Sequence, residues 1–131
     1  MGSLAAELLR VVVLCHQFRR LRFHWLDVDA EIADFDGANI KQVTQNQSLN
    51  LTPAWSLDGK KIVFTSYLKR NPDLYLIDVD GKNLQQFSHY PGLNLSPSWS
   101  PDGKQIALMM GMQGKSEIFL RRYQEYPRSP T

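Results

Sequence analysis

The chain has 131 residues and a formal net charge of +2, with 43% apolar and 21% charged residues. This length suits one domain or a piece of a larger one, and the composition excludes a disordered tail. The positive excess lies in the two flanks, so the middle of the chain has no basic face for a phosphate backbone. We therefore expect no nucleic acid partner.

Residues 1–29 form an N-terminal extension that the sequence leaves unassigned. Its apolar run at residues 4–15, LAAELLRVVVLC, has a spacing that suits a short helix. Glu7 and Arg10 interrupt the run, and a membrane span would need ~18 apolar residues without interruption. The run has no basic residue before it and no small-residue cleavage site after it, which argues against a secretory signal. The arginines at positions 19–22 leave a mitochondrial-type presequence as an alternative.

The next segment, residues 30–120, contains two copies of one repeat. The string LNLTPAWSLDGK at residues 49–60 returns as LNLSPSWSPDGK at residues 93–104, and DGAN at 36–39 returns as DGKN at 80–83. The copies keep a constant spacing of about 44 residues, close to the length of a propeller repeat. Two unrelated segments would not keep this register.

Turn residues divide the first full repeat into four short strands, which we expect at residues 51–56, 61–67, 73–79 and 84–87. Asp58-Gly59 and Asp80-Gly81 predict tight hairpins, and Asn71-Pro72 predicts a loop because proline cannot continue a strand ladder. Four antiparallel strands in ~44 residues make one propeller blade.

The apolar runs at residues 62–64 and 74–77 do not alternate with polar residues, which is typical of strands covered on both faces. Trp55 and Trp99 recur once per repeat, so we expect both indoles in the core between blades. The predicted fold is all-β: a partial propeller of about two four-stranded blades, with a hairpin at residues 31–44, a whole blade at 51–87, three strands at 95–120 and a tail at 121–131.

The string P-x-W-S-x-D-G-K, at residues 53–60 and 97–104, is typical of the WD40-like PD40 repeat. With the D-x-D-G hairpins and the N-L-T/S-P string, the chain resembles the TolB-like propeller family over residues 31–120. The resemblance implies a non-catalytic protein- or peptide-binding module of the Tol-Pal cell-envelope system, in the periplasm, with a Pal-like lipoprotein as partner. Two departures stand out: Val11 lies one period before Trp55 without the repeat string, and Arg121-Arg122 replaces Ile77-Asp78.

By the same resemblance, the partner-binding surface is a mouth built from the loops that enter the first strand of each blade. Backbone-pairing amides and hydroxyls there would alternate with apolar leucines. The predicted binding residues are Leu49, Asn50, Leu51, Thr52, Leu93, Asn94, Leu95 and Ser96. An alternative is that the two asparagines only cap their own turns.

The repeat boundaries leave the last sheet with three strands and place a separate hairpin before the whole blade. Unpaired strand edges invite pairing with another copy. We therefore predict a homo-oligomer in which residues 40–44 of one chain complete the final sheet of the next.

The residues predict no enzyme activity, no cofactor and no metal. The nucleophile elbow G-x-S-x-G is absent, and His16, His24 and His89 lack the helical zinc spacing. One cysteine, Cys15, cannot form a disulfide or a thiolate metal site within one chain. Two further interpretations stay open: an accessory propeller fragment of a prolyl-oligopeptidase-like peptidase, and a selected or engineered fragment without native activity.

Overall fold

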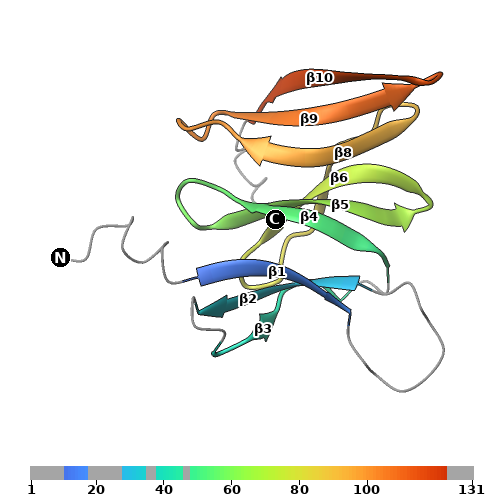
Figure 1. The fold of residues 1–131 in the computed structure, drawn as a ribbon. Helices are drawn as coiled ribbons and strands as arrows, with labels where there is room; N and C mark the ends of the chain where they lie inside the picture. The colour runs from blue at the N-terminus through green and yellow to red at the C-terminus, as the bar shows by residue number, and fades with distance from the viewer. Residues whose placement is uncertain (1–10, 18–27, 35–37, 46–47, 124–131) are drawn as a thin grey trace, which may run out of the picture.

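The computed structural model describes residues 11–17, 28–34, 38–45 and 48–123, and these residues contain strands and no helix. Ten strands form three antiparallel sheets that lie as successive layers (Figure 1). The first sheet has the order β1-β2-β3, the second β4-β5-β6-β7 and the third β10-β9-β8. The strands are β1 (Val11–Gln17), β2 (Val28–Asp34), β3 (Lys41–Gln42), β4 (Asn50–Trp55), β5 (Lys61–Lys69), β6 (Asn71–Asp78), β7 (Gln85–Ser88), β8 (Leu93–Trp99), β9 (Gln105–Met112) and β10 (Lys115–Arg122).

The second and third sheets agree with the sequence prediction of a partial propeller. The whole blade has its four predicted strands, with ends shifted by one or two residues, and the last sheet has three strands. The leading hairpin is also present, since Ile32 of β2 pairs with Lys41 of β3.

The helix interpretation of the N-terminal extension is wrong for residues 11–15. Val11–Gln17 forms β1, which pairs with β2 without a register shift from Val11↔Asp34 to Gln17↔Val28. Three consecutive valines begin this strand, and β-branched residues favour a strand over a helix. Residues 4–10 of the predicted helix lie outside the described part of the chain. The extension therefore contributes the third strand of an additional sheet.

The loop predicted at Asn71-Pro72 is also wrong, because β6 begins at Asn71. The chain reverses at Arg70, which has a positive φ of 72° between the paired residues Lys69 and Asn71. Pro72 is tolerated in the strand because the register with β5 is irregular between Ser66 and Lys69.

The core consists of two apolar layers, one on each face of the second sheet. Between the first and second sheets lie Val43, Ile62, Phe64, Tyr75 and Ile77, with Trp55 packed against them. Between the second and third sheets lie Val63, Leu74, Leu76, Ile106 and Leu108, with Trp99 packed against them. The second sheet is therefore covered on both faces, as its continuous apolar runs predicted.

The two tryptophans lie at the layers between sheets, as predicted, although both are half-buried and not fully enclosed. Trp99 joins the layers directly, because its Nε1 donates a hydrogen bond of 3.1 Å to the carbonyl of Ala54. The Tyr123 ring meets the Trp99 ring edge-on, at 5.0 Å between centroids. The indole thus ties the third sheet to the second.

The repeated W-S-x-D-G-K string forms a hairpin that is held by side chains. In the first copy the Ser56 hydroxyl donates to Asp58 Oδ1 at 2.6 Å and accepts the Lys61 amide at 2.9 Å. Ser100 and Asp102 repeat this arrangement in the second copy. Burial raises the pKa of Asp58, but hydrogen bonds from Ser56 and from the Lys60 amide outweigh it, so the pKa is lowered overall. These repeated polar residues therefore stabilise the turn.

Candidate functional site

The predicted mouth residues lie mostly inside strands and not in entering loops. Asn50, Leu51 and Thr52 are the first residues of β4, and all four of the second copy begin β8. The resemblance placed these residues in the loops that enter the first strands, whereas seven of the eight lie within β4 and β8. Both sets lie at corresponding ends of the first strands of their sheets, which supports treating them as one repeated feature.

The second and third sheets each have a bulge at the same repeat position, where Thr52 and Ser96 are exposed. Their φ angles are 50° and 53°, a left-handed conformation that is uncommon for residues other than glycine. The register shifts between Leu51 and Ala54 and between Leu95 and Ser98, so each strand has one extra residue here. A bulge of this kind redirects side chains and often lies next to a functional site.

Asn50 and Asn94 are fully buried, and hydrogen bonds tie both amides to their own turns. Asn50 Nδ2 donates to the Ser48 carbonyl at 3.0 Å. Asn94 Nδ2 donates to the Tyr90 carbonyl at 2.9 Å, and its Oδ1 accepts the Ser88 hydroxyl at 3.1 Å. This arrangement favours the alternative that the asparagines cap their turns. A partner would instead meet Leu93, which is 44% exposed, and the bulge residues.

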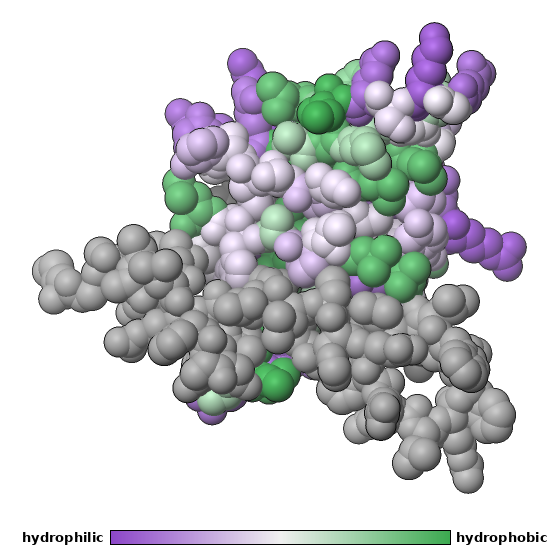
Figure 2. Space-filling model, viewed as in Figure 1, coloured by the Kyte–Doolittle hydropathy of each residue, from purple (hydrophilic) through white to green (hydrophobic). Residues whose placement is uncertain are grey.

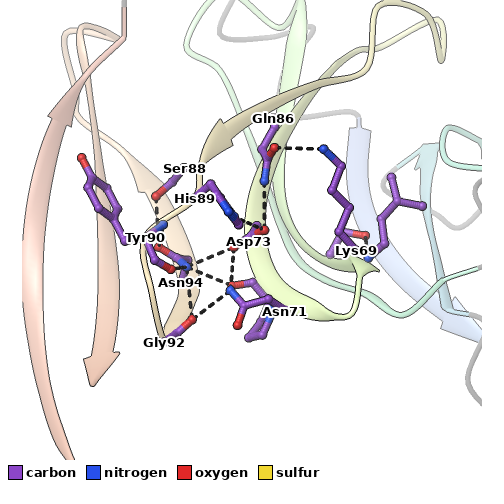
Figure 3. Close-up of polar contacts among 12 residues, drawn as sticks. Lys69, Asn71, Asp73, Gln86, Ser88, His89, Tyr90, Gly92 and Asn94 are labelled. Carbon is purple, nitrogen blue, oxygen red and sulfur yellow. Dashed lines mark hydrogen bonds and ion pairs between the residues drawn. The ribbon is translucent and has the colours of Figure 1, made fainter. Parts of the chain in front are cut away.

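Behind the mouth of the third sheet lies a polar network centred on Asp73, which is fully buried (Figure 3). Its Oδ1 accepts hydrogen bonds from Asn71 Nδ2 at 2.8 Å and Asn94 Nδ2 at 3.2 Å. Its Oδ2 accepts Gln86 Nε2 at 2.9 Å and contacts His89 Nδ1 at 2.9 Å. Four partners compensate the desolvation of this carboxylate, which would otherwise be costly.

The network connects the second sheet to the start of the third. Asp73 lies on β6 and Gln86 on β7, while Asn94 belongs to β8. Asn71 also reaches the Gly92 carbonyl at 3.0 Å, so the segment from β7 to β8 is held at several points. The network thereby fixes the position of Leu93 at the mouth.

Sequence reasoning missed this network. It weighed His89 only as a zinc ligand. The His89 side chain is 66% exposed, but its Nδ1 contacts the buried Asp73. The available signal was an aspartate at the start of a strand that is otherwise apolar. Nearby, burial raises the pKa of Tyr75, and the negative charge of Asp73 adds a smaller increase.

Two surface pockets accompany these features. One, of about 350 Å³, lies where residues 42–45 meet the turn at Asp80-Gly81. The other, of about 370 Å³, is lined by Gln86, Phe87, His89, Tyr90 and Arg121. Within the described ranges, no group of three or more His, Cys, Asp or Glu side chains could hold a metal ion. The same ranges contain no helix that is long and apolar enough to cross a membrane.

Comparison with known proteins gives a family match over most of the chain. The TolB beta propeller domain family, PD40, matches residues 19–127. The Tol-Pal system protein TolB of Desulfosudis oleivorans is 54% identical over 43 residues, which are 33% of this chain and 10% of the relative. The chain thus spans about a tenth of the length of this curated relative.

Two solved structures resemble the fold. The crystal structure of TolB from Acinetobacter baumannii superposes with a TM-score of 0.67 and 36% identity, over 72% of this chain and 24% of that chain. A putative TolB from Agrobacterium tumefaciens gives a TM-score of 0.74 over 86% of this chain and 42% of that chain. At 17% identity, the second similarity concerns the fold alone.

Proposed function

The chain belongs to the TolB β-propeller domain family, and on that premise we propose that it is a non-catalytic module that binds a protein or peptide partner of a Tol-Pal-type envelope system. The partner proposed by resemblance is a Pal-like lipoprotein, and the compartment is the periplasm. The peptidase alternative is not favoured, because the sequence relatives and the 36%-identical structure are TolB proteins.

The observation that carries this proposal is the repeated, exposed bulge at the mouth. Thr52 and Ser96 are exposed at corresponding positions with a positive φ, and the exposed Leu93 begins β8. The Thr52 hydroxyl also forms a hydrogen bond of 3.1 Å with the Thr65 hydroxyl. Hydroxyl groups next to an apolar anchor suit the recognition of an extended peptide. The Asp73 network supports this surface from behind by holding the entry to β8.

The direct test is calorimetric titration of the chain with the soluble domain of a Pal-like lipoprotein. We expect Leu93→Glu to reduce affinity at least tenfold, because it places a charge at an apolar contact. The matched control is Leu57→Glu, which changes a leucine of similar exposure in the hairpin before β5. Equal binding by both variants would contradict the location of the mouth, and no binding by the unmodified chain would contradict the partner.

We also propose that copies of the chain associate through the third sheet. Ile106 and Leu108 face the second sheet, so Ala107 and Met109 point the other way, together with their pairing partners Leu120 and Ile118. Ile118 and Leu120 are 79% and 70% exposed. Figure 2 shows apolar side chains over this sheet, at the top of the view.

The repeat indicates that this face is built to be covered. Leu74 and Leu76, one period before Ile118 and Leu120, are at most 1% exposed because the third sheet covers them. The outer edge of β10 is also unpaired among the described strands, which would permit completion of the sheet by another chain. Completion by residues 40–44 has an energetic cost, however, since Val43 and Thr44 are buried within their own chain.

Light scattering over a range of concentrations tests the association. We expect Ile118→Lys to shift the chain towards monomer, while Ile40→Lys, at a similarly exposed isoleucine, leaves the mass unchanged. The opposite result would support strand completion by residues 40–44 instead. A folded monomer at high concentration would exclude both forms of association.

A further inference from the structure

We propose that the pocket lined by Gln86, Phe87, His89, Tyr90 and Arg121, here called the Arg121 pocket, binds a carboxylate side chain of a peptide. It lies between β7, the outer strand of the second sheet, and β10, the outer strand of the third. It is thus distinct from the predicted mouth, whose residues lie on β4 and β8. In taking a peptide as the ligand, the inference rests on the proposed protein-binding function.

Arg121 is a departure from the repeat. It stands one period after Ile77, which is 4% exposed in the apolar layer of the second sheet. The arginine instead lies over the Phe87 ring, with its Cζ 4.8 Å from the ring centroid. Stacking fixes the plane of the guanidinium and leaves its N–H groups at the rim of the stack.

The charges around the pocket favour an anion. The lining contains one cation and no carboxylate, and no described acidic side chain forms an ion pair with Arg121. The nearest buried acid, Asp73, has both oxygens engaged by four side chains. A second cation lies close by, since Lys69 Nζ donates to Gln86 Oε1 at 3.3 Å. The guanidinium is therefore available to a ligand.

The wall of the pocket is held in place by the Asp73 network. His89 and Gln86 both contact Asp73 Oδ2, and the Tyr90 amide contacts Asn94 Oδ1 (Figure 3). These contacts orient the segment that carries the pocket before any ligand binds. A prearranged wall lowers the entropy cost of binding.

The shape of the pocket selects a carboxylate on a short stem. A guanidinium presents two parallel N–H donors that match the two oxygens of a carboxylate. The aromatic residues Phe87 and Tyr90 line the pocket and offer contact to methylene groups. The volume of about 370 Å³ is near the lower end for ligand pockets, which suits one side chain and not a large ligand.

The test is an NMR titration of the isotope-labelled 131-residue chain with acetyl-Ala-Glu-Ala-amide. We expect shifts at the amides of residues 86–90 and 121, with a Kd on the order of 1 mM, typical of a single small contact. Acetyl-Ala-Gln-Ala-amide should bind at least tenfold more weakly. Inorganic phosphate is a third probe, and phosphate binding as tight as that of the Glu peptide would overturn the carboxylate assignment.

Arg121→Gln should weaken binding of the Glu peptide at least tenfold. The matched control is Arg122→Gln, because the next residue lies on the opposite side of β10, is exposed and carries the same charge. Arg121→Lys should recover only part of the affinity, since it keeps the charge and loses the planar pair of donors. Amide spectra that match the unmodified chain confirm that each variant is folded.

Three results would overturn the proposal: no shift at the pocket amides, equal binding of the Glu and Gln peptides, and equal losses for Arg121→Gln and Arg122→Gln. The last would mean that general charge attraction is responsible. Binding of a lipoprotein that responds to Leu93→Glu would stand in each case. Failure of the pocket is therefore distinguishable from failure of the proposed function.

Discussion

Replacing Asp73 by asparagine tests whether the buried network holds the second and third sheets together. The carboxylate accepts four contacts with its two oxygens, whereas an asparagine has one oxygen and one NH₂ group. Two of the four donors would face another donor. Asn71 and Asn94 share one carboxylate oxygen, and Gln86 and His89 share the other, so the NH₂ group would face one of these pairs. In the first pair Asn94 is fully buried and cannot turn to water, while in the second His89 is 66% exposed and Gln86 is half-buried.

The expected cost follows from the donors that lose their acceptor. A buried unsatisfied donor costs ~1–3 kcal/mol, and loss of a hydrogen bond to a charged group costs a similar amount. Removal of a buried charge offsets part of this. We therefore expect Asp73→Asn to lower the free energy of unfolding by about 3 kcal/mol, which corresponds to a fall of roughly 12 °C in Tm for a domain of this size.

Thermal and urea unfolding followed by circular dichroism provide the measurement. The control is Asp80→Asn, because Asp80 is exposed and accepts a hydrogen bond from the Lys82 amide at 2.9 Å. We expect that variant to lose less than about 1 kcal/mol. If Asp73→Asn were no more destabilising than Asp80→Asn, the network would not hold the sheets, and the account of how Leu93 is positioned would be wrong.

Three further predictions concern the turns and the layer between sheets. In urea unfolding, Gly92→Ala should lose more than ~2 kcal/mol of stability, because an added Cβ would lie 2.1 Å from the Gly111 carbonyl oxygen. The control Gly114→Ala, also at positive φ but with open space around it, should lose about 1 kcal/mol. Trp99→Phe should lower stability by about 1–2 kcal/mol, since the bond to the Ala54 carbonyl is lost and that acceptor stays half-buried; equal Tm values for the variant and the unmodified chain would contradict this role. The lowered pKa values of Asp58 and Asp102 mean that the folded state favours both carboxylates, so their stabilisation is present above the ordinary value of 3.8 and is lost as the pH falls below it. The double variant Asp58→Asn, Asp102→Asn should therefore show a flatter fall of Tm between about pH 5 and 2, and an unchanged slope would contradict the assignment.

The fold was predictable from the sequence where the repeat is intact. Constant spacing and turn residues located the four strands of the second sheet, and the outer limits of the third sheet, within one or two residues. The first sheet was harder, because β1 departs from the repeat spacing and its apolar run lies in a stretch that also suits a helix. What decides for a strand is the free edge of β2, a tertiary partner that local spacing does not show.

The site was predictable only in outline. Repeat position located the two strand starts correctly, but it did not separate residues that face a partner from residues that support the turn. Asn94 and Leu93 are neighbours, yet one is fully buried and the other is 44% exposed. Asn94 is enclosed because Asp73, far away in the sequence, offers an acceptor behind it. Such a long-range polar pair carries no local pattern.

Comparison of the second and third sheets shows how the same repeat serves two environments. Leu74 and Leu76 keep their apolar character as Ile118 and Leu120, although the later pair is exposed. Ile77, by contrast, becomes Arg121, which no longer fills a core but stacks on Phe87. A sheet that had lost its covering partner would be expected to lose its apolar face first, because exposed apolar area favours aggregation. The third sheet shows the opposite: its outer face stays apolar, and the change lies at Arg121, on the side that contacts β7. This pattern supports both proposals, that another copy of the chain covers the outer face and that Arg121 binds a polar ligand.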